Sequence, residues 1–517
     1  MATGSGFNTH SSIQILDDSL RMAAQETGEF DFSVKNLPLK LFINNEYVES
    51  KSGRYLTVRN PKDASLVSDK VPLAGEVDVE AAVIAAEKAL PAWKKMSNAK
   101  RRDIMMKFAE LVRNNARLLT QLNRITHGAP WAGFGGFEIN VCADTFVYNA
   151  GWIDKFSGEA VPQDEGIMQI TRNEPLGITA AIVPWNAAII MIGEKGAPAL
   201  ATGNCFILKP SEKTPFAALA IGNLIREAGF PPGVFQILSG DGSTGALLAS
   251  HMRIRKISFT GSIATGKKVQ EAAARSNLKR VHLELGGKSP AVIFDDCNLE
   301  NALTWCVNGL VGNSGQICMA TTRLYVQEAI FDKFAASYKQ KLEERVKAMG
   351  DPDEEGIVLG PLVDEAQFNT VTGFVERAIL EKQGTLLTGG GKKGGSEGYF
   401  VTPTVFTNVN PDAEIYSSEI FGPVSILNSF KTEEEVLDKA NALEYGLMAG
   451  VFTNDITRAL RVAGEIDSGM VGINCITLKM LNTPVGGMKQ SGVGRENGRA
   501  ALEAFTEPKT IMINMAL

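Results

Sequence analysis

TAAIVP (residues 179–184) begins the segment that decides the fold, because short apolar runs and helical stretches alternate from there to residue 286. The runs are apolar almost throughout, as expected for strands that are covered on both faces. Helical stretches such as 214–228 and 264–274 separate them. The pattern predicts an α/β fold with a doubly wound parallel sheet of the dinucleotide-binding type. The other strands are expected at CFILKP (205–210), VFQILS (234–239), KISFT (256–260) and VHLEL (281–285).

A second alternating region, residues 290–488, predicts another α/β unit. After it, KTIMINM (509–515) alternates like an edge strand. An exposed edge strand tends to pair with another strand, and a second subunit can provide one. Upstream of the first sheet, residues 37–70 predict short strands. Two amphipathic helices are expected at 77–96 and 98–126. The second unit is expected to have strands near 291–294, 323–327, 401–406, 423–430, 449–453 and 470–474, helices at 328–348, 365–383, 432–442 and 456–466, and a surface loop at 389–398.

The composition argues against several classes of protein. The chain has 517 residues and should divide into two or three domains. A formal net charge of −6 argues against nucleic-acid binding. Six Cys without a CxxC pair and four scattered His argue against a disulfide framework and a metal site. No apolar run reaches the ~20 residues of a membrane-spanning helix, and no targeting signal is recognised, so we expect a cytoplasmic protein without a membrane partner.

Three short segments after strands are candidates for holding a dinucleotide. GDGSTG (240–245) matches G-x-G-x-x-G, but it follows the third strand and no acidic residue ends the next. GSIATG (261–266) begins a helix, where backbone N–H groups and the Ser262 hydroxyl can meet a pyrophosphate. In KPSE (209–212), Glu212 can accept from ribose hydroxyls and repel a 2′-phosphate. Ordinary turns and a solvated charge pair explain these residues equally well.

Cys318, Glu284 and Asn186 are the candidates for covalent chemistry. Cys318 in GQICMA (315–320) is either a nucleophile or a buried inert thiol. Glu284 lies between two Leu on a predicted strand, and an unpaired buried carboxylate has the raised pKa that suits a general base. Asn186, after Pro-Trp, is either an oxyanion donor or a turn residue.

Together these segments resemble the aldehyde dehydrogenase superfamily over residues 40–515. The motifs that carry the resemblance are EPLG (174–177), PWN (184–186), KPSE (209–212), FTGS (259–262), LELGGK (283–288), GQIC (315–318), EIFGPV (419–424) and GGMKQSGVGRE (486–496). The resemblance implies an NAD(P)-dependent enzyme of the hydrolytic, non-acylating type. It also implies a Rossmann-like cofactor domain, a second α/β catalytic domain and a small β oligomerisation arm.

The resemblance implies a role for each catalytic residue. Cys318 is the nucleophile, forming a thiohemiacetal and then a thioester, while Asn186 and the Cys318 backbone N–H hold the oxyanion. Glu284 activates the water that releases the acid, and Lys195 and Glu496 form a proton-relay pair behind it.

The resemblance also implies a site for NAD. Glu419 and Phe421 hold the nicotinamide ribose and ring. Glu212 at the adenine ribose favours NAD, with NADP left open because some members with this Glu use both. The remaining cofactor residues are Trp185, Lys209, Ser211, Gly242, Gly261, Ser262, Gly266 and Leu285.

The resemblance further implies a homodimer or homotetramer and a division of the chain. The expected parts are an N-terminal extension (1–36), an NAD-binding domain (37–153 and 176–286), a catalytic domain (287–488) and oligomerisation segments (154–175 and 489–517), with the hairpin in 154–175 paired to the C-terminal strand.

Several positions differ from the well-known aliphatic members and bear on the substrate. Small or charged residues replace aromatic ones at Ala187, Val485, Glu194, Gly312 and Lys479. Each lost aromatic side chain frees much of the ~150–250 Å² that it would bury, unless neighbours refill the space. We therefore expect a bulky, branched or aromatic aldehyde with a polar or charged tail near Glu194 and Lys479. The predicted pocket comprises Ala187, Met191, Glu194, Gly312, Ile317, Met319, Lys479 and Val485.

Two other functions remain open. A CoA-acylating semialdehyde dehydrogenase uses CoA in place of water, and such enzymes usually lack a base at the position of Glu284. A non-catalytic binding protein of the same fold has no need to retain Cys318, Glu284 and Asn186 together.

Overall fold

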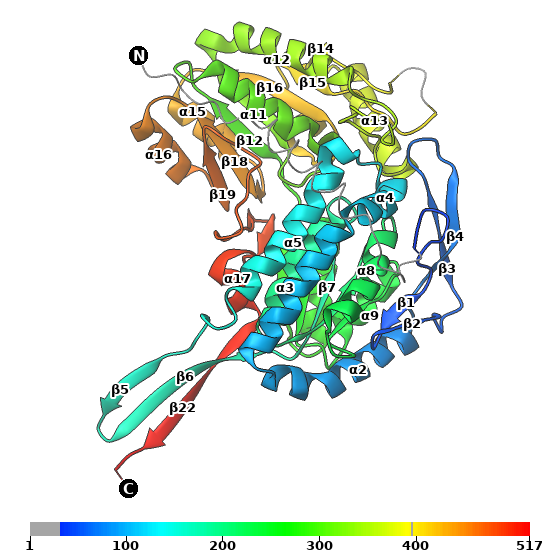
Figure 1. Cartoon of the computed structure of the whole chain (residues 1–517). Helices are drawn as coiled ribbons and strands as arrows, with labels where there is room; N and C mark the ends of the chain where they lie inside the picture. Colours follow the sequence, from blue (N-terminus) through cyan, green and yellow to red (C-terminus); the bar gives the residue numbers. More distant parts are fainter. Residues whose placement is uncertain (1–31, 394–396, 517) are drawn as a thin grey trace, which may run out of the picture.

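The computed structural model describes residues 32–393 and 397–516. Its first sheet has eight strands in the order β2-β1-β9-β8-β7-β10-β11-β21 (Figure 1). The five central strands are parallel and lie where the apolar runs predict them. This confirms the α/β fold class. Their bounds are β7 Ile178–Ile182, β8 Cys205–Lys209, β9 Phe235–Ile237, β10 Lys256–Thr260 and β11 Arg280–Glu284, with β1 Leu41–Ile43, β2 Glu46–Val48 and β21 Gly492–Val493 antiparallel at the edges.

Helices cover the first sheet and explain why its central strands are apolar. Helix α2 (Glu76–Lys95) packs on β7 and β8, and α10 (Ile263–Arg275) packs on β10 and β11. The segment expected to form one helix over 98–126 forms two, because the chain turns at Asn115. The remaining helices of this part are α3 Asn98–Asn114, α4 Ala116–His127, α5 Gly136–Ala150, α6 Ala188–Met191, α7 Ala197–Ala201, α8 Phe216–Ala228 and α9 Gly242–Ser250.

The order of the strands creates a switch point between β7 and β10. From β7 the chain moves outward through β8 to β9, then returns to the other side of β7 with β10 and continues to β11. The connections after β7 and β10 therefore leave in opposite directions and open a crevice at the carboxyl ends of the two strands. Ligands of doubly wound sheets bind in such crevices.

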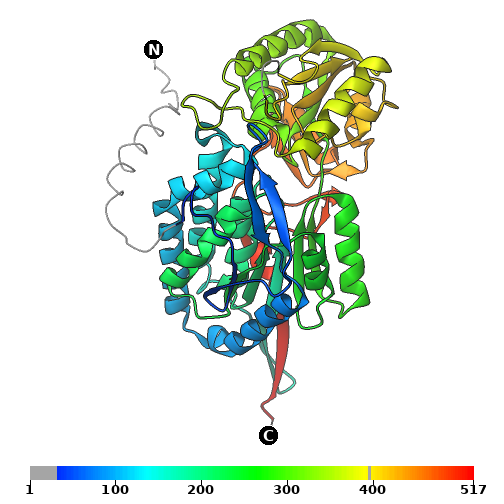
Figure 2. The same ribbon diagram turned by 90° about the vertical axis from the view of Figure 1, so that its right-hand side faces the viewer.

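The second sheet has seven strands in the order β14-β15-β16-β13-β12-β18-β19 and lies at the other end of the molecule (Figure 2). Helix α11 and strand β14 were not among the expected elements. The strands are β12 Ser289–Ile293, β13 Thr321–Gln327, β14 Thr385–Thr388, β15 Thr404–Thr407, β16 Val424–Phe430, β18 Met448–Phe452 and β19 Met470–Ile473. The helices are α11 Leu299–Val311, α12 Phe331–Val346, α13 Glu365–Leu380, α15 Glu433–Asn441 and α16 Ile456–Glu465.

Two connections bring the sheets together. Strand β11 ends at Glu284, and β12 of the second sheet begins five residues later at Ser289. Strand β13 pairs in parallel with β12, so the segment that leads into β13 begins at the same edge. Cys318 lies in that segment, three residues before β13 begins at Thr321. The carboxylate at the end of the first sheet and the thiol at the start of the second therefore lie at one junction.

A three-stranded sheet projects from the body as an arm (Figure 1). The expected C-terminal strand is part of β22 (Thr506–Asn514), which pairs along its length with β6 (Ile167–Pro175) of the same chain. β5 (Ala160–Asp164) lies on the other side of β6, so β22 keeps one unpaired edge within the described residues. Strands β3 (Tyr55–Arg59) and β4 (Leu66–Pro72) form a separate hairpin, and β3 contacts α4.

Two predicted segments lie partly outside the described residues. They are residues 1–31 of the N-terminal extension and residues 394–396 of the surface loop. In the part of the chain that is described, no helix combines the length and the apolar character that crossing a bilayer requires.

Candidate active site

The thiol and the carboxylate singled out in the sequence face each other at the junction of the two sheets. The Cys318 Sγ lies 3.8 Å from Glu284 Oε1. Glu284 is buried, and its second carboxylate oxygen has no hydrogen-bond partner among the described residues. A buried carboxylate with an open acceptor beside a thiol can take the thiol proton and can hold a water molecule.

Burial and neighbouring charge set the protonation of both groups. Loss of solvent raises the pKa of Glu284 to about 7, and the Glu496 carboxylate adds to the effect. Burial also raises the pKa of the Cys318 thiol well above its usual value, and Glu284 adds to that shift. At neutral pH the thiol keeps its proton while Glu284 is divided between its acid and base forms, so its ionised form is present to accept the thiol proton as the sulfur attacks.

Behind Glu284 lies a buried ion pair between Lys195 and Glu496. The Lys195 ammonium and the Glu496 carboxylate are in direct contact, and both side chains are almost fully buried. Burial opposes ionisation of Glu496, but the Lys195 charge outweighs it and lowers the pKa of that carboxyl. His282 lies 3.4 Å from the same carboxylate, and burial lowers the pKa of its ring to about 3, which keeps it neutral. Glu496 is therefore a fixed negative charge next to the candidate base.

Asn186 and the Cys318 backbone offer N–H groups near the thiol. Asn186 lies just after β7, and its Nδ2 donates to the carbonyl of Gln316 at 2.9 Å. That bond uses one of the two amide hydrogens and anchors the side chain beside the segment that carries Cys318. The second amide hydrogen and the Cys318 N–H have no acceptor among the described residues. This arrangement suits an oxyanion site.

A cavity of about 490 Å³ extends over the thiol and reaches the switch point between β7 and β10. One side is lined by the start of α10, and the other side is lined mainly by apolar and aromatic side chains. The ring of Phe421 meets that of Trp185 edge to face, with 5.4 Å between the centroids. The predicted site residues that line it are Trp185, Asn186, Ala187, Met191, Gly261, Ser262, Glu284, Leu285, Ile317, Cys318, Met319, Glu419, Phe421 and Lys479.

The side of the cavity near α10 fits an anionic, ribose-bearing group. Ser262 caps α10 by accepting from the Thr265 N–H, so the positive end of the helix faces the cavity. Glu419 accepts from the Gly287 N–H at 3.0 Å and exposes part of its carboxylate to the cavity. A Cβ at Gly286 would come within 2.0 Å of Glu419, and one at Gly266 within 2.7 Å of Leu285, so both glycines permit close packing here.

The remaining predicted cofactor residues lie next to this cavity, at the carboxyl end of β8. Lys209 is buried, and its Nζ lies 3.8 Å from the half-exposed Glu212 carboxylate. Ser211 lies between them in the chain and is buried. Helix α9 begins at Gly242, where an added Cβ would meet no atom within 4 Å. The Lys209 ammonium can donate and the Glu212 carboxylate can accept hydrogen bonds, and the start of α9 leaves open space. These features suit the binding of a nucleoside.

Three predicted pocket residues do not line the cavity. Val485 is buried because its backbone pairs with that of Glu496. Gly312 begins the turn before the nucleophile segment, and an added Cβ would lie 3.3 Å from the Ile317 side chain. The Glu194 side chain is fully buried and pairs with Lys479 at 2.5 Å, so the two charges predicted to hold a substrate tail bind each other.

Much of the apolar wall consists of residues that were not predicted from the sequence. Phe137 and Val141 come from the start of α5, and Phe134 comes from the helical turn directly before it. Leu478 and Leu481 come from the loop that also carries Lys479. No local pattern marks these residues, because apolar positions of a helix or loop look alike whether they face a core or a cavity. Only the packing of α5 beside the β7 connection identifies them.

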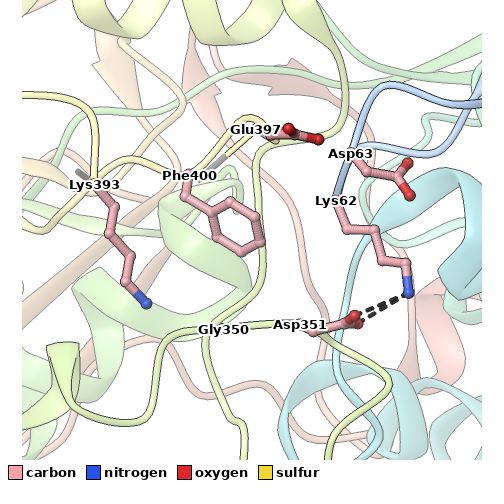
Figure 3. Close-up of a pocket in the computed structure, with 7 residues that line it drawn as sticks. All are labelled: Lys62, Asp63, Gly350, Asp351, Lys393, Glu397 and Phe400. Atoms are coloured by element: carbon pink, nitrogen blue, oxygen red, sulfur yellow. Dashed lines mark hydrogen bonds and ion pairs between the residues drawn. The ribbon is translucent and has the colours of Figure 1, made fainter. Parts of the chain in front are cut away.

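A second hollow, of about 300 Å³, shares no lining residue with the first (Figure 3). Lys62 spans it to reach Asp351 at 2.9 Å and also pairs with Asp353 at 2.6 Å. Lys393 donates to the carbonyl of Met349. These charges are used in holding segments together, and no Cys or His lines this hollow among the described residues.

Comparison with known proteins agrees with this geometry. The sequence model of the aldehyde dehydrogenase family matches residues 47–511. The chain belongs to the aldehyde dehydrogenase family. It is 43% identical over 478 residues to an aldehyde dehydrogenase of Agaricus bisporus, covering 92% of this chain and 95% of that protein. It is 42% identical to the human retinal dehydrogenase 2, covering 92% of each.

A solved member of the aldehyde dehydrogenase family has the same fold. The indole-3-acetaldehyde dehydrogenase of P. syringae, solved in complex with NAD+ and IAA, aligns with a TM-score of 0.90 and 34% identity over 96% of this chain and 99% of that one. The resemblance found in the motifs is thereby confirmed, and with it the assignment of the chain to an enzyme family that oxidises aldehydes.

Proposed function

We propose that this protein oxidises a bulky or aromatic aldehyde to the carboxylic acid with NAD+, through a thioester on Cys318. The observation that carries the proposal is the 3.8 Å approach of the Cys318 thiol to the Glu284 carboxylate. That approach lies within a cavity that joins the start of α10 to an apolar wall. A nucleophile, a base and room for two reactants meet there.

The first step is addition of the thiol to the aldehyde. Glu284 takes the Cys318 proton as the sulfur attacks the carbonyl carbon, and a C–S bond forms. The carbonyl oxygen becomes an oxyanion, which accepts from the free Asn186 amide hydrogen and from the Cys318 N–H. The product of this step is a thiohemiacetal.

The second step converts the thiohemiacetal to a thioester and then to the acid. Bound NAD+ would accept a hydride at this stage, held by residues such as Phe421, Glu419 and Ser262. Glu284 then releases the proton taken from Cys318 to solvent, and water adds to the thioester carbon while the regenerated carboxylate removes a proton from it. Collapse of the adduct breaks the C–S bond, releases the carboxylic acid and returns the proton to the thiol.

We propose NAD as the preferred cofactor. Glu212 at the end of β8 offers two acceptor oxygens to a ribose diol, whereas a 2′-phosphate would bring like charge to it. The adjacent Lys209 ammonium is buried and lies 3.8 Å from Glu212, so it only partly offsets that repulsion. Use of NADP with lower efficiency is therefore expected.

The width and lining of the substrate side support a bulky aldehyde. Ala187 and Met191 leave space that aromatic side chains would fill, while Phe134 and Phe137 supply flat apolar surfaces. Two relatives are named for their action on retinal and on indole-3-acetaldehyde, which are large aldehydes. Steady-state kinetics over a series from acetaldehyde to naphthaldehyde test the proposal. A higher kcat/KM for acetaldehyde than for the aromatic aldehydes would refute it.

Release of the free acid separates hydrolysis from transfer to CoA. We expect the acid to form without CoA and at an unchanged rate when CoA is added, because the Glu284 carboxylate is present to activate water. An absolute requirement for CoA would favour the acylating alternative.

We also propose a cytoplasmic homodimer or homotetramer. All six Cys are free, which suits a reducing compartment. The unpaired edge of β22 is long and carries the exposed Met512, so a second subunit is a natural partner for it. Sedimentation of the purified protein distinguishes a monomer from either oligomer.

A further inference from the structure

The Glu194–Lys479 pair is not needed by the proposed reaction, yet it is buried beside it. Lys479 Nζ lies 2.5 Å from Glu194 Oε1, and only 17% of the Lys479 side chain and none of the Glu194 side chain is exposed. Glu194 comes from the turn between α6 and α7, and Lys479 comes from the loop after β19. Burying two charges costs several kcal/mol per ion, and an apolar pair of similar volume is often as stable. Stability alone therefore does not explain this buried ion pair, and its electrostatic effect on neighbouring groups is the alternative.

The electrostatic effect of the Glu194–Lys479 pair acts on Glu284. One carboxylate oxygen each of Glu194, Glu284 and Glu496 lies within 4.8 Å of the other two. Three carboxylates at this spacing cannot all be ionised unless cations compensate them. Lys195 compensates Glu496, and Lys479 compensates Glu194. Glu284 thus lies between two ion pairs and has no cation of its own.

The other charged and titratable groups around this cluster are few. Cys318 faces Glu284 from the nucleophile segment, and His282 faces Glu496 from β11. Lys256 on the neighbouring strand β10 and Arg495 also act on that end of the cluster. Glu419 faces Cys318 from the cofactor side. None of these forms an ion pair with Glu284 in the described part of the chain, which leaves the two lysine–glutamate pairs as its nearest electrostatic control.

We infer that the Glu194–Lys479 ion pair sets the charge of Glu284, with Glu194 holding the general base near its protonated form and Lys479 preventing full protonation. The inference rests on the proposed role of Glu284 as the base. Glu194 and Lys479 act as positioning residues in this scheme, because neither is assigned a contact with the reacting atoms.

The two members of the pair act on Glu284 in opposite directions. Removing the Glu194 charge leaves Lys479 free to stabilise ionised Glu284, which lowers the pKa of that carboxyl. Removing the Lys479 charge withdraws a stabilising cation and raises the pKa of Glu284. Removing both charges should restore the pKa of Glu284 to near its wild-type value, since the two opposite shifts cancel.

The test is the pH profile of thioester hydrolysis. 4-Nitrophenyl acetate should acylate the proposed nucleophile Cys318. The burst of 4-nitrophenolate then reports acylation of the thiol, and the steady state reports hydrolysis of the acyl-enzyme by Glu284. In Glu194→Gln the amide keeps the shape and the contact with Lys479. The acidic limb of the pH profile should move down by about one pH unit, a gain of about fivefold in the hydrolysis rate at pH 6. In Lys479→Met it should move up, and in the double variant it should return toward the wild type.

Controls separate this inference from the function on which it rests. Lys339→Met removes a lysine from an exposed ion pair with Glu343 and should leave the pH profile unchanged. Loss of the hydrolytic steady state in Glu284→Gln tests the proposed function independently of Glu194. If Lys479→Met does not fold, as judged by NAD binding and thermal unfolding, Lys479→Arg replaces it and should retain the wild-type limb.

Three results would overturn the inference while leaving the function intact. One is an acidic limb that does not move in Glu194→Gln. Another is an equal loss of rate at every pH in the variants. The third is a change confined to KM for polar-substituted aldehydes, which would make the pair a substrate contact.

Discussion

Replacement of Glu284 by Gln removes the proposed base while preserving its shape. Gln fills the same buried space at the end of β11, so the packing around Cys318 should remain. Its amide cannot accept the thiol proton across the 3.8 Å that separates the two side chains, and it cannot deprotonate water. Both proton transfers of the proposed reaction are lost.

The magnitude follows from the chemistry and from the pKa of Glu284. General-base catalysis contributes about 10²–10⁴-fold, so kcat should fall by that factor. Because burial raises the pKa of Glu284 to about 7, the wild type gains its base form as pH rises. The ionised fraction grows from about one tenth at pH 6 to about nine tenths at pH 8, a rise of about tenfold in rate. In Glu284→Gln this rise should disappear.

NADH absorbance under steady-state conditions, recorded between pH 5.5 and 9, measures both effects. Glu419→Gln is the matched control, because burial raises the pKa of Glu419 to about 7 as well and its carboxylate lines the same cavity. That variant should bind NAD less tightly but keep the pH step. The reasoning is refuted if the step survives in Glu284→Gln and vanishes in Glu419→Gln.

Three further predictions concern the nucleophile, the relay pair and the cofactor. Cys318→Ala should abolish NADH formation without weakening NAD binding by calorimetry, and residual turnover would mean that another group is the nucleophile. Lys195→Met leaves Glu496 buried without its cation and should lower the free energy of unfolding by about 3–5 kcal/mol in urea titrations at pH 8. A loss no greater than that of an exposed lysine variant would contradict it. Glu212→Thr should raise kcat/KM for NADP by about tenfold or more, since a like charge is removed from the 2′-phosphate position. An unchanged cofactor ratio would place the ribose elsewhere.

The cofactor half of the fold follows from local patterns. Strands such as β8 and β10 are short, largely apolar runs followed at once by Pro or Gly, and these signals depend on neighbouring residues only. The same holds for the start of α10 at Ser262, where a capping hydroxyl precedes a helix. Strand β14, which is short and half exposed at the edge of its sheet, lacks such a signal and was not expected.

The wall of the substrate cavity could not be predicted in this way. Phe134 and Leu481 have no local signal, because their positions in helix and loop are compatible with core packing as well as with a cavity. Glu194 and Lys479 were expected to lie near a polar substrate tail, since they replace aromatic residues of the well-known aliphatic members. In the folded protein Glu194 and Lys479 form an ion pair with each other, and their removal from solvent favours this pairing.

The sequence by itself determined the α/β fold, the family and the candidates for the thiol, the base and the oxyanion donor, since these depend on residue type and on motifs that are continuous in the chain. Only the tertiary structure decided that Cys318 and Glu284 lie 3.8 Å apart, because the short passage from β11 to β12 joins two sheets. It also decided that a second ion pair is buried beside them. Distances between residues far apart in the chain depend on how whole sheets and helices pack, and no local pattern records them.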